Sequence, residues 1–170
     1  MILFQKDNFI DSTTLFPKIR QLKFFDKISS KGQWPGFRTK DLKNSCPEIF
    51  NEIKESIKKL ELPFLKNTTF KMYAHVRLKK DNQNDFIHTD TANNTIYSGL
   101  IYLNKTNLDS ATLFYDEKDN IIHGVKYVQD RLIIFSSAYR HMSFNNFGNN
   151  IDNGRVTLNL FFKNEDSKTI

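Results

Sequence analysis

The pair His88 and Asp90, in the segment Phe86-Ile87-His88-Thr89-Asp90, carries the clearest chemical signal in the chain. On an extended segment, residues i and i+2 point to the same side, so the imidazole and the carboxylate can reach one point. Two histidines and one carboxylate on one face of an octahedron suit Fe(II) and leave three positions open. An isolated His-x-Asp pair is more often an ordinary surface or hydrogen-bonded pair, so a third ligand is needed.

We expect His141 to be the third ligand. It follows the strongly apolar run Leu132–Phe135, far enough beyond His88 for several strands to cross and return. The other two histidines, His75 and His123, have no carboxylate two residues later, and we interpret both as structural. His75 lies on an alternating segment and could line a cavity.

The segment from Arg155 to Phe162 alternates between apolar and polar residues. Its even-numbered residues are apolar, which places Arg155, Thr157 and Asn159 together on the opposite face. A guanidinium binds a carboxylate through two parallel hydrogen bonds, and a hydroxyl two residues later adds a third. The alternative is an exposed strand in which Arg155 pairs with a surface acid.

Helices are predicted before residue 66. Ser12 or Thr13 can cap a first helix, with Pro17 in its early turns. Ser45-Cys46-Pro47-Glu48 has the form of a capping box. Apolar residues then follow at helical spacing, at Ile49, Ile53, Ile57 and Leu60, before Pro63 ends the second helix.

Strands are predicted after residue 66, where the apolar period changes to two. The expected strands are 70–78, 95–103, 111–115, 121–128, 131–135 and 155–162. Several short strands at modest spacing indicate an α+β chain with a jelly-roll core, and the preceding helices should pack on one face of the larger sheet. We expect a single domain over residues 1–170, with helical support in 1–66, the β core in 67–163 and a solvated tail in 164–170.

The composition is that of a folded protein, with 39% hydrophobic and 26% charged residues among 170. Cys46 is the only cysteine, which excludes an internal disulfide and favours a reducing compartment. Gln5 to Asn8 interrupt any signal-peptide core, and no apolar run approaches a membrane span, so we expect a cytoplasmic protein without a membrane partner. The net charge of +6 comes from scattered lysines, which argues against a nucleic-acid partner.

Taken in order, these segments resemble the 2-oxoglutarate/Fe(II)-dependent oxygenase superfamily, and within it the prolyl-4-hydroxylase-like branch. His88-Thr89-Asp90 matches the His-x-Asp motif, and Ile101–Asn104 matches the Tyr-Leu-Asn strand that follows it. Ala111–Phe114, Asp130–Phe135 with His141, and Arg155–Thr157 match the later strands. The likeness covers roughly residues 70–163. It departs at Ser110 and Ala111, where the family has two glycines, and at residues 76–79, which lack its Tyr-x-x-Gly form.

The resemblance implies a double-stranded β-helix that binds Fe(II) through His88, Asp90 and His141. It implies 2-oxoglutarate as co-substrate, with Arg155, Tyr102 and Thr157 on its distal carboxylate, and O₂, with ascorbate as an optional addition. The implied activity is that of a dioxygenase that hydroxylates a C–H bond and converts 2-oxoglutarate to succinate. Because related halogenases lack the carboxylate, Asp90 favours hydroxylation.

The substrate stays open at this point. The branch suggests a peptide or protein residue, such as proline, while a free amino acid, another small metabolite or a modified nucleotide are alternatives. Phe161 stands where nucleic-acid demethylases of this type carry a second arginine, which argues against that role. Trp34, Arg38 and the Asn-rich segment 142–154 could contact substrate or be inert. Two other hypotheses are a non-catalytic jelly-roll binding module and a cupin-like structural metal site.

Overall fold

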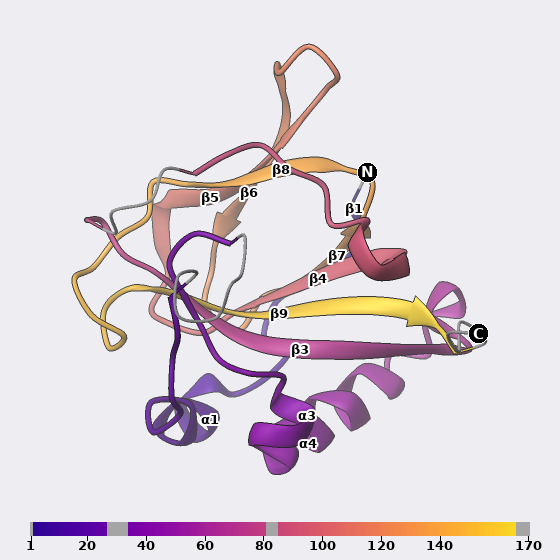
Figure 1. Ribbon diagram of the computed structural model, residues 1–170, viewed down its shortest axis with the longest axis vertical. Helices are drawn as coiled ribbons and strands as arrows, with labels where there is room; N and C mark the ends of the chain where they lie inside the picture. Colours follow the sequence, from indigo (N-terminus) through magenta and orange to yellow (C-terminus); the bar gives the residue numbers. More distant parts are fainter. Residues whose placement is uncertain (1, 27–33, 81–84, 166–170) are drawn as a thin grey trace.

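The computed structural model describes residues 2–26, 34–80 and 85–165, and Figure 1 shows their arrangement. Within them the strands form two antiparallel sheets, a major sheet in the order β1-β7-β4-β9-β3-β2 and a minor sheet in the order β6-β5-β8. The elements are β1 (Ile2–Lys6), α1 (Ser12–Ile19), β2 (Phe37–Arg38), α3 (Leu42–Ser45), α4 (Pro47–Lys58), η1 (Pro63–Leu65), β3 (Thr68–Arg77), η2 (Ala92–Asn94), β4 (Tyr97–Tyr102), β5 (Asn107–Tyr115), β6 (Ile121–Tyr127), β7 (Leu132–Ser136), β8 (Arg140–Phe144) and β9 (Arg155–Asn164). Two facing antiparallel sheets agree with the predicted jelly roll.

The two predicted helices are present, but both predicted N-caps are wrong. Asp11 caps α1, and its carboxylate accepts a hydrogen bond from the Thr13 amide at 3.0 Å. Cys46 stands at the N-cap of α4 and makes no side-chain capping bond, so the capping box does not form. The reason is that Ser45 belongs to the short helix α3, where its hydroxyl donates to the Asp41 carbonyl at 3.0 Å.

All six predicted strands occur, with ends shifted by a few residues, and three further strands were not predicted. These are β1, β2 and β8, which are short or polar and form because a neighbouring strand pairs with them. The Asn-rich segment 142–154, which the sequence marks as a loop, therefore begins within a strand. Met142, Ser143 and Phe144 belong to β8 and pair with β5.

The major sheet buries both of its faces. One face shares a hydrophobic cluster with the helices, in which Val156, Leu158 and Leu160 of β9 lie with Leu15 of α1 and Ile53 of α4. In Figure 1 the helices lie on one side of this sheet and the minor sheet on the other. A second cluster lies between the sheets and contains Leu100, Tyr102, Phe114, Val125, Tyr127, Ile133 and Phe135. The odd-numbered residues of β9 therefore face the minor sheet, as their alternation predicted.

No helix in the described ranges is both long enough and apolar enough to span a bilayer.

Candidate metal and co-substrate site

A pair of backbone hydrogen bonds brings the first and third predicted ligands together. The His88 amide donates to the His141 carbonyl at 3.1 Å, and the His141 amide donates to the His88 carbonyl at 2.9 Å. Two residues later, the Asp90 amide donates to the Ser137 carbonyl at 2.9 Å. The segment that carries His88 and Asp90 is thus tied to β8 and the turn before it, which fixes its register against His141.

Both imidazole rings are oriented by backbone carbonyls. The Nδ1 atom of His88 lies 3.0 Å from the Phe86 carbonyl oxygen, and the Nδ1 atom of His141 lies 2.9 Å from that of Tyr139. A carbonyl can only accept, so each Nδ1 carries a proton, and Nε2 is the ring atom that would bind a metal. In metal sites too, the ring nitrogen that does not bind the metal donates a hydrogen bond, and this bond sets the tautomer and the orientation of the ring.

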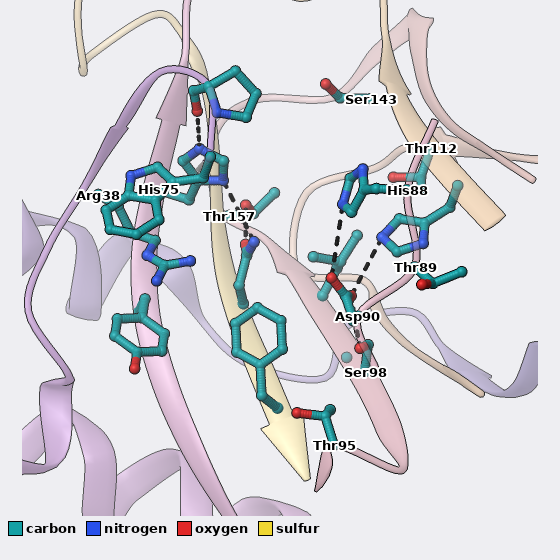
Figure 2. Close-up of a pocket in the computed structure, with 18 of the residues that line it drawn as sticks. Arg38, His75, His88, Thr89, Asp90, Thr95, Ser98, Thr112, Ser143 and Thr157 are labelled. Carbon is teal, nitrogen blue, oxygen red and sulfur yellow. Dashed lines mark hydrogen bonds and ion pairs between the residues drawn. The ribbon is translucent and has the colours of Figure 1, made fainter. Parts of the chain in front are cut away.

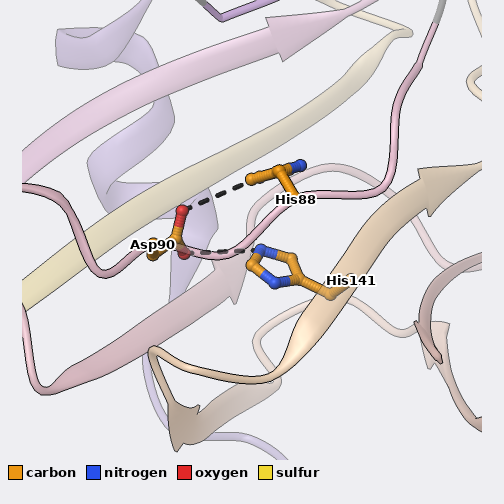
Figure 3. A group of neighbouring side chains, drawn as sticks. All are labelled: His88, Asp90 and His141. Carbon is orange, nitrogen blue, oxygen red and sulfur yellow. Dashed lines mark ion pairs between the residues drawn. The ribbon is translucent and has the colours of Figure 1, made fainter. Parts of the chain in front are cut away.

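The two Nε2 atoms face the Asp90 carboxylate (Figure 3). Nε2 of His88 lies 3.7 Å from Oδ1 of Asp90, and Nε2 of His141 lies 3.3 Å from Oδ2. One donor atom from each of the three residues fits within 4.8 Å of the other two. Neighbouring ligands of an octahedral ion, each roughly 2.1 Å from the metal, are separated by about 3 Å. The donor set and its spacing therefore fit one divalent ion.

The charges around the three residues favour metal binding. Burial tends to raise the pKa of Asp90, but the hydrogen bond and charge of His141 and the hydrogen bond from Ser98 outweigh it and leave the pKa below its usual value. The Ser98 hydroxyl donates to Oδ2 at 2.7 Å. Burial, followed by the neighbouring His141, lowers the pKa of His88. An ionised carboxylate beside a neutral imidazole is the protonation state that a metal requires.

These three side chains line a cavity of about 470 Å³ between the two sheets (Figure 2). Its floor is the inner face of β3, β9 and β4. In register across that floor, His75 lies beside Thr157, and Thr157 lies beside Tyr102. The volume is within the usual range for small-ligand sites, about 300–1,000 Å³.

Arg155 lies at one end of the cavity, as predicted, and is 4% exposed. Its Nη2 donates to the Thr112 hydroxyl at 2.9 Å, while its buried Nε has no hydrogen-bond partner among the described residues. Burial lowers the pKa of Arg155, with the nearby hydroxyls of Tyr102 and Tyr127 acting in the opposite direction. An arginine with a buried free donor can accept an anion at this point.

Tyr102 and Thr157 lie close to Arg155, but neither side chain hydrogen-bonds to it. The Tyr102 hydroxyl lies 2.8 Å from the Thr112 hydroxyl, and the Thr157 hydroxyl donates to the Asn159 side chain at 2.6 Å. Thr112 connects Tyr102 and Arg155, a role that was not predicted from the sequence. Its position within the alternating strand 111–115 was the available signal.

The remaining residues singled out from the sequence divide between the cavity and the surface. Trp34, Arg38 and His75 line the cavity, whereas His123 is exposed on β6. Residues 31–33, which precede Trp34 in the same loop, lie outside the described ranges.

No protein-family model matches the sequence, and a search of curated proteins finds no match. Solved structures match over nearly the whole chain. A prolyl-4-hydroxylase from Pseudomonas putida is 14% identical, with a TM-score of 0.66 over 95% of this chain and 91% of the other. HygX from Streptomyces hygroscopicus, solved with nickel and 2-oxoglutarate bound, is 9% identical, with a TM-score of 0.70 over 96% and 83%.

A third similar structure is a prolyl hydroxylase from Trichoplax adhaerens, in complex with a peptide fragment of hypoxia inducible factor. It is 15% identical, with a TM-score of 0.64 over 95% of this chain and 83% of the other. At these identities the likeness shows the fold alone. The resemblance predicted from the motifs is confirmed at that level, since the chain shares the fold of prolyl-4-hydroxylases and other 2-oxoglutarate/Fe(II) oxygenases.

Proposed function

We propose that this protein is an Fe(II)- and 2-oxoglutarate-dependent dioxygenase whose metal ligands are His88, Asp90 and His141. The observation that carries the proposal is the convergence of two imidazole Nε2 atoms and one carboxylate within 4.8 Å on the wall of a cavity. The bound metal would supply the chemistry of O₂ activation, in which 2-oxoglutarate is oxidised to succinate and CO₂ while a C–H bond is hydroxylated. The protein's part is to orient and shield that chemistry.

In this proposal Arg155 binds the distal carboxylate of 2-oxoglutarate. Its guanidinium is buried and charged, and Thr112 holds one of its nitrogen atoms in place. Thr157 and Tyr102 flank the same position on neighbouring strands, so their hydroxyls can contribute further hydrogen bonds after a small rotation. Arg155 is therefore a co-substrate-binding residue, and Thr112 positions it.

The donor set favours hydroxylation over halide transfer, because Asp90 would supply the third protein ligand to the metal. We propose a peptide or protein residue as substrate, in the manner of prolyl hydroxylases, because one similar structure holds a peptide fragment. A small molecule is the alternative, because another similar structure binds hygromycin B. We further propose that residues 1–170 act as one domain, in which the helices of residues 1–66 support the major sheet.

The test is the anaerobic addition of Fe(II) and then 2-oxoglutarate to the purified protein. We expect a weak visible charge-transfer band that requires both, and slow succinate release once O₂ is admitted. His88→Ala should abolish the band and the succinate. Loss of a group that only hydrogen-bonds to a metal ligand costs about 10–100-fold in metal affinity, so loss of a ligand itself should cost more.

The matched control is His123→Ala, because His123 is exposed on β6 and is not among the residues that line the cavity or hold the three donor atoms. It should behave as the unmodified protein does. A binding module would give no band at all, and a structural metal would bind without any response to 2-oxoglutarate. Normal succinate release by His88→Ala would show that the ligand assignment is wrong.

A further inference from the structure

The cavity contains a second arginine, Arg38, on the wall opposite the candidate metal ligands. Figure 2 shows Arg38 and His75 on one side, His88 and Asp90 on the other, and Thr157 between them. Arg38 belongs to β2, which is three strand positions from β4 in the order β4-β9-β3-β2. Arg38 and the candidate metal ligands line the same cavity of about 470 Å³, which leaves room for a small molecule or a substrate side chain between them.

Aromatic rings hold the Arg38 guanidinium by its faces. Its Cζ atom lies 3.7 Å from the centre of the Trp34 ring and 4.1 Å from that of Tyr73, with the Phe161 ring at 6.0 Å. Stacking of this kind fixes the plane of a guanidinium and leaves its edge, where the N–H donors are, free to bind. The Arg38 side chain is thus held in place without using its hydrogen-bond donors.

Those donors have no acceptor within the described part of the chain. The buried Nε of Arg38 is unpaired, and so is the buried Nε1 of Trp34. No carboxylate among the described residues forms an ion pair with Arg38; the groups that favour its charge are the Tyr73 hydroxyl and, at longer range, Asp90, a candidate metal ligand. Both unpaired atoms are donors, so the group that would satisfy them is an acceptor.

The charge of Arg38 also has no directly paired carboxylate among the described residues. Burial lowers the pKa of Arg38, which records the cost of holding a cation away from water. Buried charges are normally paired, because an isolated one is expensive. Lys71 and Lys163 line the same cavity, so the surroundings are positive as well. An anionic ligand would relieve this cost.

The segment that carries Arg38 is fixed against the cavity floor. Gly36 has φ +80°, and a Cβ atom on it would lie 2.4 Å from the Val76 carbonyl oxygen. Nε2 of His75 donates to the Pro35 carbonyl at 2.6 Å, and the Ala74 amide donates to the Thr39 hydroxyl at 3.0 Å. The position of Arg38 is therefore built into the fold and is not that of a free surface side chain.

We propose that Arg38, clamped by Trp34 and Tyr73, is a substrate-binding residue that takes a terminal oxyanion, a carboxylate or a phosphate, on the molecule to be hydroxylated. The inference rests on the proposed function, since it places that oxyanion across the cavity from the metal. The inference narrows the proposed substrates to molecules that carry a carboxylate or a phosphate. For a peptide the oxyanion would be an acidic side chain or the carboxyl terminus.

Trp34 provides a direct probe, because it is the only tryptophan in the chain and stacks on Arg38. The experiment titrates the anaerobic Fe(II)/2-oxoglutarate-loaded protein with acetate in one arm and inorganic phosphate in the other, at constant ionic strength. We expect a saturable change in tryptophan fluorescence in at least one arm, and the stronger arm identifies the type of oxyanion. Arg38→Gln should weaken that response by about 10- to 100-fold, the range for a hydrogen-bonded charge.

Lys40→Gln is the matched control, because Lys40 is an exposed cation two residues away and should leave the titration unchanged. Arg38→Lys keeps the charge but loses the planar fork, so it should fold and bind the anion more weakly than arginine does. As a second measurement, pairs of candidate substrates that differ only as acid and amide should stimulate succinate release unequally. Arg38→Gln should raise KM for the acid and remove the preference.

Two outcomes would overturn the inference: no saturable response in either arm, or the same response in Arg38→Gln as in the unmodified protein. The proposed function fails separately, through the absence of the charge-transfer band. If the band is present and the fluorescence is silent, only the oxyanion site is lost. If the fluorescence responds and the band is absent, the anion site remains and the oxygenase assignment is wrong.

Discussion

The two ends of the cavity each hold an arginine, but they are built differently. Arg155 begins β9, a strand paired on both sides within the major sheet, and a protein hydroxyl on the minor sheet meets its guanidinium. Arg38 lies on β2, a two-residue strand at the sheet edge, and the Trp34 and Tyr73 rings stack on its guanidinium. The difference suggests that Arg155 binds one constant ligand. The shape of the site around Arg38, in contrast, depends on a short segment at the edge of the sheet.

A hydrogen-bonded row runs from Thr157, one of the proposed co-substrate residues, to the segment that carries Arg38. The Thr157 hydroxyl donates to the Asn159 side chain, and Asn159 lies 3.4 Å from Nδ1 of His75. Because Nε2 of His75 must donate to the Pro35 carbonyl, Nδ1 is the acceptor of the Asn159 amide. His75, interpreted from the sequence as a structural residue, thus joins the co-substrate end to the segment that carries Arg38.

The largest expected effect comes from Arg155→Gln, which removes the charge at the buried end. Truncating one partner of a buried, hydrogen-bonded charge pair costs about 2–5 kcal/mol, so the 2-oxoglutarate concentration required should rise about 30-fold or more. The measurement is succinate release against 2-oxoglutarate concentration. Arg20→Gln is the control, because Arg20 is exposed and pairs with Asp152 at 2.9 Å. An unchanged requirement would remove Arg155 from its proposed role.

The next effect is a dependence of the free energy of unfolding on pH, and it comes from the buried His75. Burial lowers the pKa of His75 from 6.5 to about 3. Between these values the unfolded chain binds more protons than the folded one, so the free energy of unfolding should fall as the pH is lowered from 6.5 towards 3. Each unit of pKa difference is worth about 1.4 kcal/mol, so the loss should amount to a few kcal/mol.

Urea unfolding across this pH range measures the effect. His75→Gln keeps a hydrogen-bonding side chain but cannot titrate, so its unfolding free energy should depend less on pH. His123→Gln, at an exposed position, should retain the full dependence. Equal pH profiles for the His75 variant and the unmodified protein would show that His75 is not held neutral by its surroundings.

The smallest expected effect comes from Gly36→Ala, which should displace the segment that carries Arg38 and leave the residues at the other side of the cavity in place. Gly36→Ala puts a Cβ atom into contact with the β3 backbone at a positive φ, a strain of about 1–3 kcal/mol. We expect a modest loss of stability and a red shift of Trp34 emission as the segment moves into water. The Fe(II)/2-oxoglutarate band should persist, because its residues lie on other elements.

Gly124→Ala is the control for that substitution. Gly124 is exposed on β6, and an added Cβ there would meet only the end of the Leu113 side chain, at 3.0 Å. If Gly36→Ala abolished the charge-transfer band as well, the two ends of the cavity would not be independent.

Much of the site followed from local sequence pattern. The spacing of His88 and Asp90 and the alternation after Arg155 are consequences of extended backbone, in which every second side chain faces the same way. The capping box at Ser45 failed for the opposite reason. Ser45 ends α3 just before α4 begins, and its hydroxyl donates to the Asp41 carbonyl, so it does not cap α4.

The sequence by itself determined which residue types could hold a metal and a carboxylate, and in which order along the chain they come. Only the tertiary structure decided that β8 forms and presents His141, that Thr112 meets Arg155, and that Trp34 and Tyr73 enclose Arg38. The physical reason is the distance along the chain over which each interaction acts. Strand alternation is set by neighbouring residues, whereas strand pairing and ring stacking depend on which distant segments the packed sheets bring together.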